Sequence, residues 1–148
     1  MTLLRRAPGA LPLGKLHPIP PGFFCVPSAI CAITGEDALS VVVPALNRHN
    51  RENTLLEQIV GVHVRHAHSV LRELGYEVRR SVGPERTVSA WGKLFSQEIV
   101  LAAAEEHCVI IHDGRVFDTW TPHGEPASNH PFHDANVWSA VLVRKNSS

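Results

Sequence analysis

Apolar and polar positions divide the chain into a helical first half and a β-rich second half. Apolar residues dominate 26–33 and Gly35 follows them, so this stretch is predicted to form a short buried helix. Apolar positions at helical spacing predict a second helix over 38–48, which Pro44 should kink or split. A third helix is expected over 62–74, where the apolar spacing runs up to a glycine.

The second half carries the pattern of an antiparallel sheet. Two apolar runs flank Asp113 and Gly114, a dipeptide typical of a two-residue hairpin turn. Thr87 is expected to cap a short helix over 88–94. Residues 121–136, which are rich in His and Pro, are expected to form a long polar loop. Further strands are predicted at 76–79, 98–104 and 137–143, although the alanines of 98–104 would also suit a helix.

Length and composition favour one globular domain. The 148 residues are 44% hydrophobic and 19% charged, which suits a chain that folds around its own core. Residues 1–22 contain five prolines and little periodicity, so they are expected to form an extended N-terminal arm. Its part from residue 13 onward is expected to form a wall of the site. The single domain is then predicted to span 23–148.

Charge and cysteine content exclude several classes of function. Fourteen Lys and Arg balance fourteen Asp and Glu, so the chain lacks the basic excess typical of nucleic-acid binding. No apolar run approaches the roughly 20 residues of a membrane span. Three cysteines, Cys25, Cys31 and Cys108, do not make a disulfide framework and suit a reducing cytoplasm. A cytoplasmic protein that binds neither nucleic acid nor membrane is therefore predicted.

Cys25 stands where a protein can turn cysteine into a nucleophile. It opens the predicted helix over 26–33, and Pro27 fits a first helical turn because its missing N–H would have no partner there. A thiol at a helix N-terminus lies near unpaired N–H groups and the positive end of the helix dipole. Both favour the thiolate, the nucleophilic form of cysteine.

The predicted hairpin supplies partners for such a nucleophile. With Asp113 and Gly114 as the turn, His107 would face Trp120, and alternation places both on one face with Asp118. His107 and Asp118 are then diagonal cross-strand neighbours, close enough for a carboxylate to orient an imidazole. Together with Cys25 they form a candidate catalytic triad.

These residues carry a resemblance to a known family. A cysteine that opens an apolar helix, followed much later by His107-x-Val109-x-x-x-Asp113-Gly114-x-x-x-Asp118-Thr119-Trp120, resembles the papain-like cysteine peptidases, in particular small bacterial and phage members. The resemblance covers about residues 25–143, with its specific part in these two segments. It implies an α+β, papain-like fold in which N-terminal helices pack on a C-terminal antiparallel sheet. It also favours a strand over 98–104.

The resemblance further implies roles for the site residues. Cys25 would be the nucleophile, His107 the base and Asp118 the orienting acid, in acyl transfer from a peptide or protein without a cofactor or metal. Phe24 and Trp120 are expected to line the cleft. The family usually has an oxyanion-donating glutamine at the position of Ile19, so the candidate donors are Cys25, through its backbone N–H, and His17.

The same residues also fit roles outside catalysis. Each triad member taken singly could have a structural role, and the absent glutamine favours an alternative function: an inactive papain-like fold that binds a host protein. A zinc protein built on some of the ten histidines is a third possibility. However, His63 and His66 share a helical face that His68 does not, so packing or surface roles are favoured for them. The residues between 121 and 136 include His123, His130 and His133, which are expected to be loop residues without a role.

Overall fold

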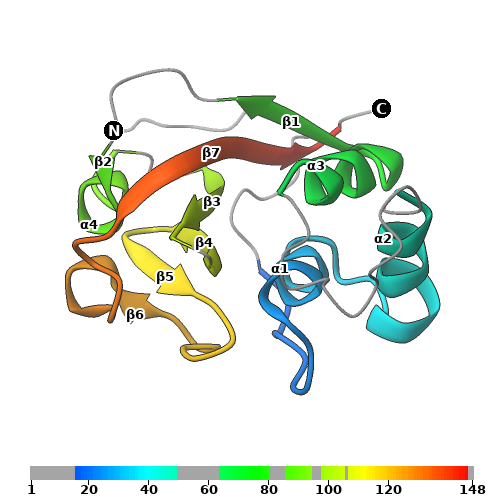
Figure 1. Ribbon diagram of the computed structural model, residues 1–148, viewed down its shortest axis with the longest axis horizontal. Helices are drawn as coiled ribbons and strands as arrows, with labels where there is room; N and C mark the ends of the chain where they lie inside the picture. Colours follow the sequence, from blue (N-terminus) through cyan, green and yellow to red (C-terminus); the bar gives the residue numbers. More distant parts are fainter. Residues whose placement is uncertain (1–15, 50–63, 81–85, 95–97, 106, 147–148) are drawn as a thin grey trace, which may run out of the picture.

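The computed structural model describes residues 16–49, 64–80, 86–94, 98–105 and 107–146. In these residues the fold is α+β, with four α-helices and a seven-stranded antiparallel sheet (Figure 1). The helices are α1 (Cys25–Thr34), α2 (Val43–His49), α3 (Val64–Glu73) and α4 (Val88–Trp91). The strands are β1 (Tyr76–Arg80), β2 (Arg86–Thr87), β3 (Ile99–Ala104), β4 (His107–His112), β5 (Arg115–Phe117), β6 (Glu125–Pro126) and β7 (Asn136–Lys145).

The expected first helix is confirmed as α1. Residues 26–33 of this helix are all buried, which explains their apolar character. Gly35 ends the helix at φ 76°, a left-handed conformation that costs glycine little, and its N–H bonds to the carbonyl of Cys31. At the other end, Phe24 is the N-cap residue and has no side-chain oxygen to accept a backbone N–H.

The segment after α1 splits near Pro44, as expected. A π-helical turn, η1 (Ala38–Val42), precedes α2, because proline has no N–H with which to continue a regular helix. The side chain of Asp37 starts this segment by accepting a hydrogen bond from the Ser40 N–H at 2.9 Å. The expected third helix is confirmed as α3 in its described part, and the cap of Thr87 on α4 is also confirmed.

The expected hairpin is confirmed around Asp113 and Gly114. Both residues have positive φ, 54° and 75°, as a type I′ turn requires. The pairing of His112 with Arg115 and of Ile110 with Phe117 follows the expected register. Strand β5 ends at Phe117, however, so the continuation of the ladder to residues 118–120 was wrong. The sheet order is β1-β7-β3-β4-β5-β6, with β2 beside β7.

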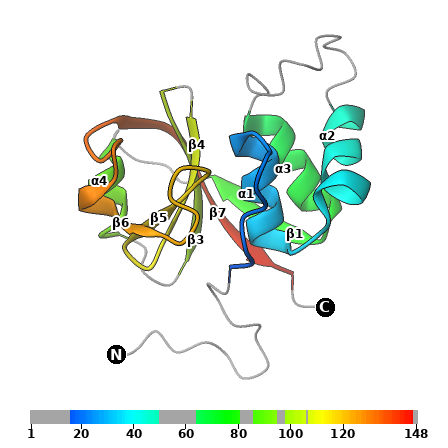
Figure 2. The same cartoon turned by 90° about the horizontal axis from the view of Figure 1, so that it is seen from below.

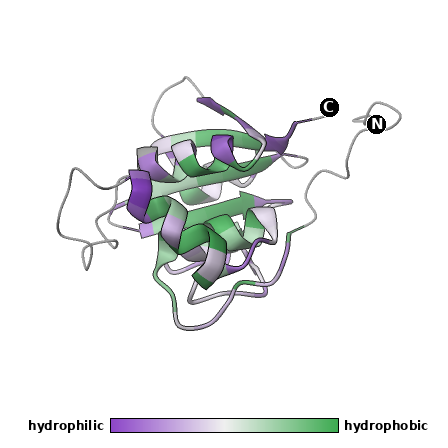
Figure 3. Cartoon of the chain, turned by 90° about the vertical axis from the view of Figure 1, so that its right-hand side faces the viewer, coloured by the Kyte–Doolittle hydropathy of each residue, from purple (hydrophilic) through white to green (hydrophobic). Residues whose placement is uncertain are grey.

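Two apolar clusters lie on opposite faces of the sheet. Helices α1, α2 and α3 cover one face, against which Leu101, Cys108 and Ile110 pack. The residues that alternate with these along the strands, among them Val109 and Ile111, point to the second face and pack against α4 and the segment near β6. Figure 2 shows α1, α2 and α3 on one side and α4 on the other, and Figure 3 shows polar and apolar residues alternating along the helices. Residues 98–104 are confirmed as a strand from Ile99 onward, because both faces are covered.

The polar loop expected over 121–136 has a different outcome. It contains β6, the 3-10 helix η3 (Ala127–Asn129) and a fully buried histidine, so its description as a simple loop was wrong.

Of the expected N-terminal arm, residues 1–15 lie outside the described part of the chain. In the described part, no single helix is long and apolar enough to cross a membrane, although α1 and Ala38–His49 would pass as a pair bent by 111°.

Candidate active site

Cys25 lies at the first position of α1, in contact with the beginning of β4. The side chain of His107 and the backbone N–H of Cys108 act on its thiol as hydrogen-bonding neighbours that lower its pKa. Burial raises the pKa of the thiol, but these two hydrogen bonds, the charge of His107 and the N–H of Cys25 itself together outweigh burial. The pKa of Cys25 therefore lies below its ordinary value, which is the condition for a reactive thiol.

His107 connects this thiol to a buried carboxylate. Its Nε2 lies 2.9 Å from Oδ2 of Asp118, which leaves Nδ1 as the ring nitrogen that faces Cys25. Burial lowers the pKa of His107, but the hydrogen bonds and charges of Asp118 and Cys25 raise it to about 9. A lowered thiol pKa beside a raised imidazole pKa favours a thiolate–imidazolium pair.

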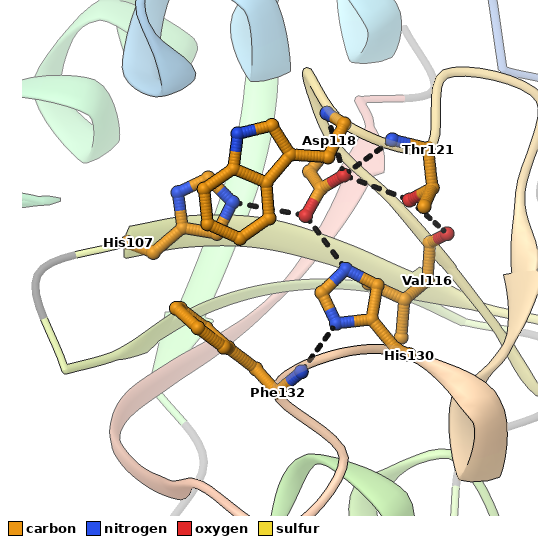
Figure 4. Close-up of polar contacts among 7 residues, drawn as sticks. His107, Val116, Asp118, Thr121, His130 and Phe132 are labelled. Atoms are coloured by element: carbon orange, nitrogen blue, oxygen red, sulfur yellow. Dashed lines mark hydrogen bonds and ion pairs between the residues drawn. The ribbon is translucent and has the colours of Figure 1, made fainter.

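Asp118 is held by a tight local turn and fully removed from water. Its Oδ1 accepts hydrogen bonds from the N–H of Trp120 at 3.0 Å and from the N–H and hydroxyl of Thr121, both at 2.7 Å (Figure 4). Burial raises the pKa of this carboxyl group, but the hydrogen bonds from His107, Thr121 and His130 lower it to well below the ordinary value. Asp118 is thus a permanent anion beneath His107.

His130 is a member of this site that the sequence did not indicate. Its side chain is fully buried, and its Nε2 lies 2.7 Å from the same Oδ2 of Asp118 that bonds His107 (Figure 4). The expectation that His130 is a loop residue without a role was therefore wrong. The tertiary fold brings it from the segment after η3, and no motif around His130 marks it. His123 and His133 are exposed, as expected for loop residues.

Aromatic rings surround the imidazole of His107. The ring of Trp120 stacks on it at 4.5 Å between centroids and 15° between planes, and the ring of Phe132 meets it edge-on at 5.4 Å. Trp120 remains 57% exposed, so its outer face is open to a ligand. Phe24, next to Cys25, is 53% exposed. Both residues expected to line the cleft are thus surface aromatics beside the reactive groups.

The candidate oxyanion donors have different positions. The backbone N–H of Cys25 lies beside its own sulfur. The N–H of Val26 is next in the first turn of α1. After it, Pro27 has no N–H, and the N–H of Ser28 bonds to the carbonyl of Phe24. His17 lies at the opposite end of α1: its N–H bonds to the carbonyl of Ala32, and its ring packs over Gly35.

His17 is therefore not a donor at this site. The ten residues of α1 separate it from Cys25 by roughly 15 Å. Ile19, at the position where the resemblance to papain-like peptidases predicts a glutamine, packs against the apolar cluster under α1. Losing one oxyanion donor typically costs an enzyme about 100- to 1000-fold in turnover. Among the described residues, the backbone N–H of Val26, the next residue of α1, is a candidate second donor.

The other two cysteines are in unreactive environments. Burial and the charge of Asp37 raise the pKa of Cys31 to about 11. Cys108 is buried under the helices, and burial raises its pKa well above the ordinary value. As the strand alternation predicted, Cys108 points away from the face that carries His107.

Histidines outside the triad do not form a metal site in the described residues. No group of three or more His, Cys, Asp or Glu side chains is placed to hold a metal ion there. His68 is a buried residue of α3, and burial with the charges of Arg72 and Arg80 lowers its pKa to about 4. His63 lies outside the described part of the chain.

Searches of protein-family models, of curated proteins and of solved structures each gave no significant match to this chain.

Proposed function

We propose that this protein is a cysteine-dependent acyl-transfer enzyme with a papain-like arrangement of its active site. The observation that carries the proposal is the chain of contacts from Cys25 through His107 to the buried Asp118. A structural cysteine in a core has no need of an imidazole on its sulfur. The same contacts lower the thiol pKa and raise the imidazole pKa, which is the electrostatic arrangement of an activated nucleophile.

The chemistry starts from the thiolate of Cys25 and the imidazolium of His107. The sulfur attacks the carbonyl carbon of an amide, ester or thioester, and the carbonyl oxygen takes the negative charge. The N–H groups of Cys25 and Val26, at the positive end of α1, are the donors that would stabilise this oxyanion.

Collapse of this intermediate requires a proton on the leaving group. His107 donates it from Nδ1, while Asp118 holds the ring through Nε2 and stabilises its charge until the transfer. The resulting acyl-Cys25 is then released to an acceptor: water gives hydrolysis, as in a peptidase or deamidase, and an amine gives a transferase. A peptide or protein is the proposed source of the acyl group.

One observation favours a second function, an inactive papain-like protein that binds a protein target. Ile19 stands where papain-like peptidases usually have a glutamine, and its partly buried side chain packs against the apolar cluster and offers no oxyanion donor. In that case the exposed rings of Phe24 and Trp120 would serve protein contact instead of substrate binding.

Alkylation by iodoacetamide tests whether Cys25 is an activated thiol. An ordinary thiol with a pKa of about 8.5 is only about 1% thiolate at pH 6.5, so Cys25 is expected to react at least about tenfold faster than a free cysteine at that pH. Cys31 and Cys108 are internal controls that should remain unlabelled in the folded protein when peptides are analysed by mass spectrometry. A His107→Gln variant should slow the labelling of Cys25. Equal rates at Cys25 and in a free cysteine would contradict the proposal.

Turnover distinguishes the enzyme from the binder. With p-nitrophenyl acetate, an enzyme releases nitrophenolate repeatedly through an acetyl-Cys25 intermediate, and Cys25→Ala abolishes the reaction. A single equivalent of nitrophenolate, with an acetyl group that stays on Cys25, would favour the binding function.

A further inference from the structure

Two histidines donate to one oxygen atom of Asp118. The Nε2 atoms of His107 and His130 lie 2.9 Å and 2.7 Å from Oδ2, while Oδ1 is occupied by Trp120 and Thr121 (Figure 4). An orienting carboxylate needs only the first of these partners. The second histidine is fully buried, so its presence beside the carboxylate is a built feature of the site.

The hydrogen bonds of His130 define its protonation. The backbone N–H of Phe132 points at Nδ1 of His130, at 3.0 Å. Because a backbone amide can only donate, Nδ1 must be the acceptor and carries no hydrogen. The ring hydrogen is therefore on Nε2, where it is donated to Asp118, and the imidazole is the neutral tautomer.

A neutral donor on Oδ2 changes what Asp118 does to His107. Each hydrogen bond to a carboxylate stabilises its negative charge and reduces its attraction for other protons. We propose that His130 is a positioning residue whose Nε2–H disperses the charge of Asp118 and so limits how strongly that carboxylate holds the proton on His107. The catalytic meaning of this effect rests on the proposed function, because His107 must release its proton to a leaving group.

Besides His130, the titratable side chains around His107 and Asp118 come from three places in the fold. His107 and Cys108 lie on β4, Asp118 follows β5, and Cys25 comes from α1. Cys108 stays protonated because burial raises its pKa, and Asp118 stays ionised. The titration of His107 therefore reports the strength of its pairing with Asp118 and with Cys25. His130 contacts Asp118, so it affects only the pairing of His107 with Asp118.

Two substitutions at His130 separate its two hydrogen bonds. His130→Gln places an amide N–H near the position of Nε2 and keeps the donor to Asp118, but it loses the acceptor for Phe132. His130→Asn places an oxygen near Nδ1 and keeps the acceptor for Phe132, but it loses the donor to Asp118. Both variants are first checked for folding by their thermal transitions and by the dispersion of their amide NMR signals.

The readout is the ring ¹⁵N spectrum of His107 across pH. With the donor lost in His130→Asn, the titration midpoint of His107 is expected to rise by roughly half a pH unit or more. In His130→Gln it is expected to stay at the wild-type value. A merely structural role would leave both midpoints unchanged, and that result, or a fall in the Asn variant, would overturn the proposal.

The wild-type spectrum gives an independent test that needs no variant. The proposal requires a hydrogen on Nε2 of His130 and none on Nδ1 at pH 7, and a hydrogen on Nδ1 would overturn it. Neither spectrum depends on turnover. If the protein fails to turn over p-nitrophenyl acetate, the proposed function fails, whereas the effect of His130 on His107 is still decided by the titration.

Discussion

The two ends of helix α1 carry cysteines in opposite environments. At the C-terminal end, the carbonyls of the last turn are capped by the N–H of His17, the N–H of Gly35 and the hydroxyl of Tyr76. At the N-terminal end, Phe24 has no side-chain oxygen to cap the first turn and Pro27 has no N–H, so this end is not closed by a side-chain cap. Cys31 lies in the closed part of the helix and Cys25 at the open end.

The difference shows that position within the fold, and not residue type, decides reactivity. Burial acts in the same direction on both thiols, but only Cys25 has an imidazole and backbone donors to offset it. Its pKa is therefore lowered, while that of Cys31 rises to about 11. The open end of α1 is thus left without the stabilisation that a capping side chain would give.

The largest expected effect comes from Asp118→Asn, which should make Cys25 behave more like Cys31. The amide cannot stabilise the imidazolium of His107, so the pKa of the Cys25 thiol should rise and turnover should fall by about 10³- to 10⁴-fold. Alkylation of Cys25 across pH measures the first effect and p-nitrophenyl acetate the second. Unchanged alkylation at pH 6.5 would show that the carboxylate does not support the thiolate.

A smaller effect is expected from closing the open end with a cap. In Phe24→Ser, the hydroxyl oxygen can accept a hydrogen bond from the backbone N–H of Val26. This capping bond should raise the free energy of unfolding by about 1 kcal/mol relative to Phe24→Ala. If that N–H binds the oxyanion, the same bond should lower turnover by up to about 100-fold relative to Phe24→Ala. Both variants lose the aromatic ring, so their comparison isolates the cap. Urea unfolding and p-nitrophenyl acetate turnover are the measurements, and equal turnover would exclude Val26 as a donor.

The smallest effect is a pH dependence of stability, which should separate Cys25→Ala from Cys31→Ala between pH 6.5 and 8. The folded wild type holds one proton on the Cys25–His107 pair, and the unfolded chain holds one on the thiol of Cys25. Because the two states bind the same number of protons, the free energy of unfolding of the wild type should change little with pH in this range. In Cys25→Ala, Asp118 still keeps the pKa of His107 above its ordinary value, and only the folded state binds the proton.

The sign of the slope follows from that proton. The stabilisation in Cys25→Ala is fully present below about pH 6.5 and is lost as the pH rises toward the folded pKa of His107, with a slope of at most about 1.4 kcal/mol per pH unit. Cys31→Ala should remain as flat as the wild type, because the thiol of Cys31 is protonated throughout this range. Urea unfolding at several pH values measures the slopes, and parallel slopes in the two alanine variants would rule out the thiolate–imidazolium pair.

Local patterns in the sequence determined most of the elements. Gly35 and Pro44 marked where helices end or divide, because glycine easily adopts the left-handed conformation that ends a helix and proline lacks the N–H that would continue one. Asp113 and Gly114 determined the hairpin turn and its register. That register gave the face of His107, and it brought Asp118 near enough to be proposed as its partner.

Only the tertiary structure decided how the site is completed. Asp118 reaches His107 from a turn after β5 and not from a ladder, a difference that strand alternation cannot show. His130 is part of the site because the segment after η3 folds under the carboxylate of Asp118. His17 is not part of it, because its backbone N–H bonds to Ala32 near the far end of α1. Alternation and capping act over a few residues, whereas the partners of a buried charge come from whichever distant segments pack around it.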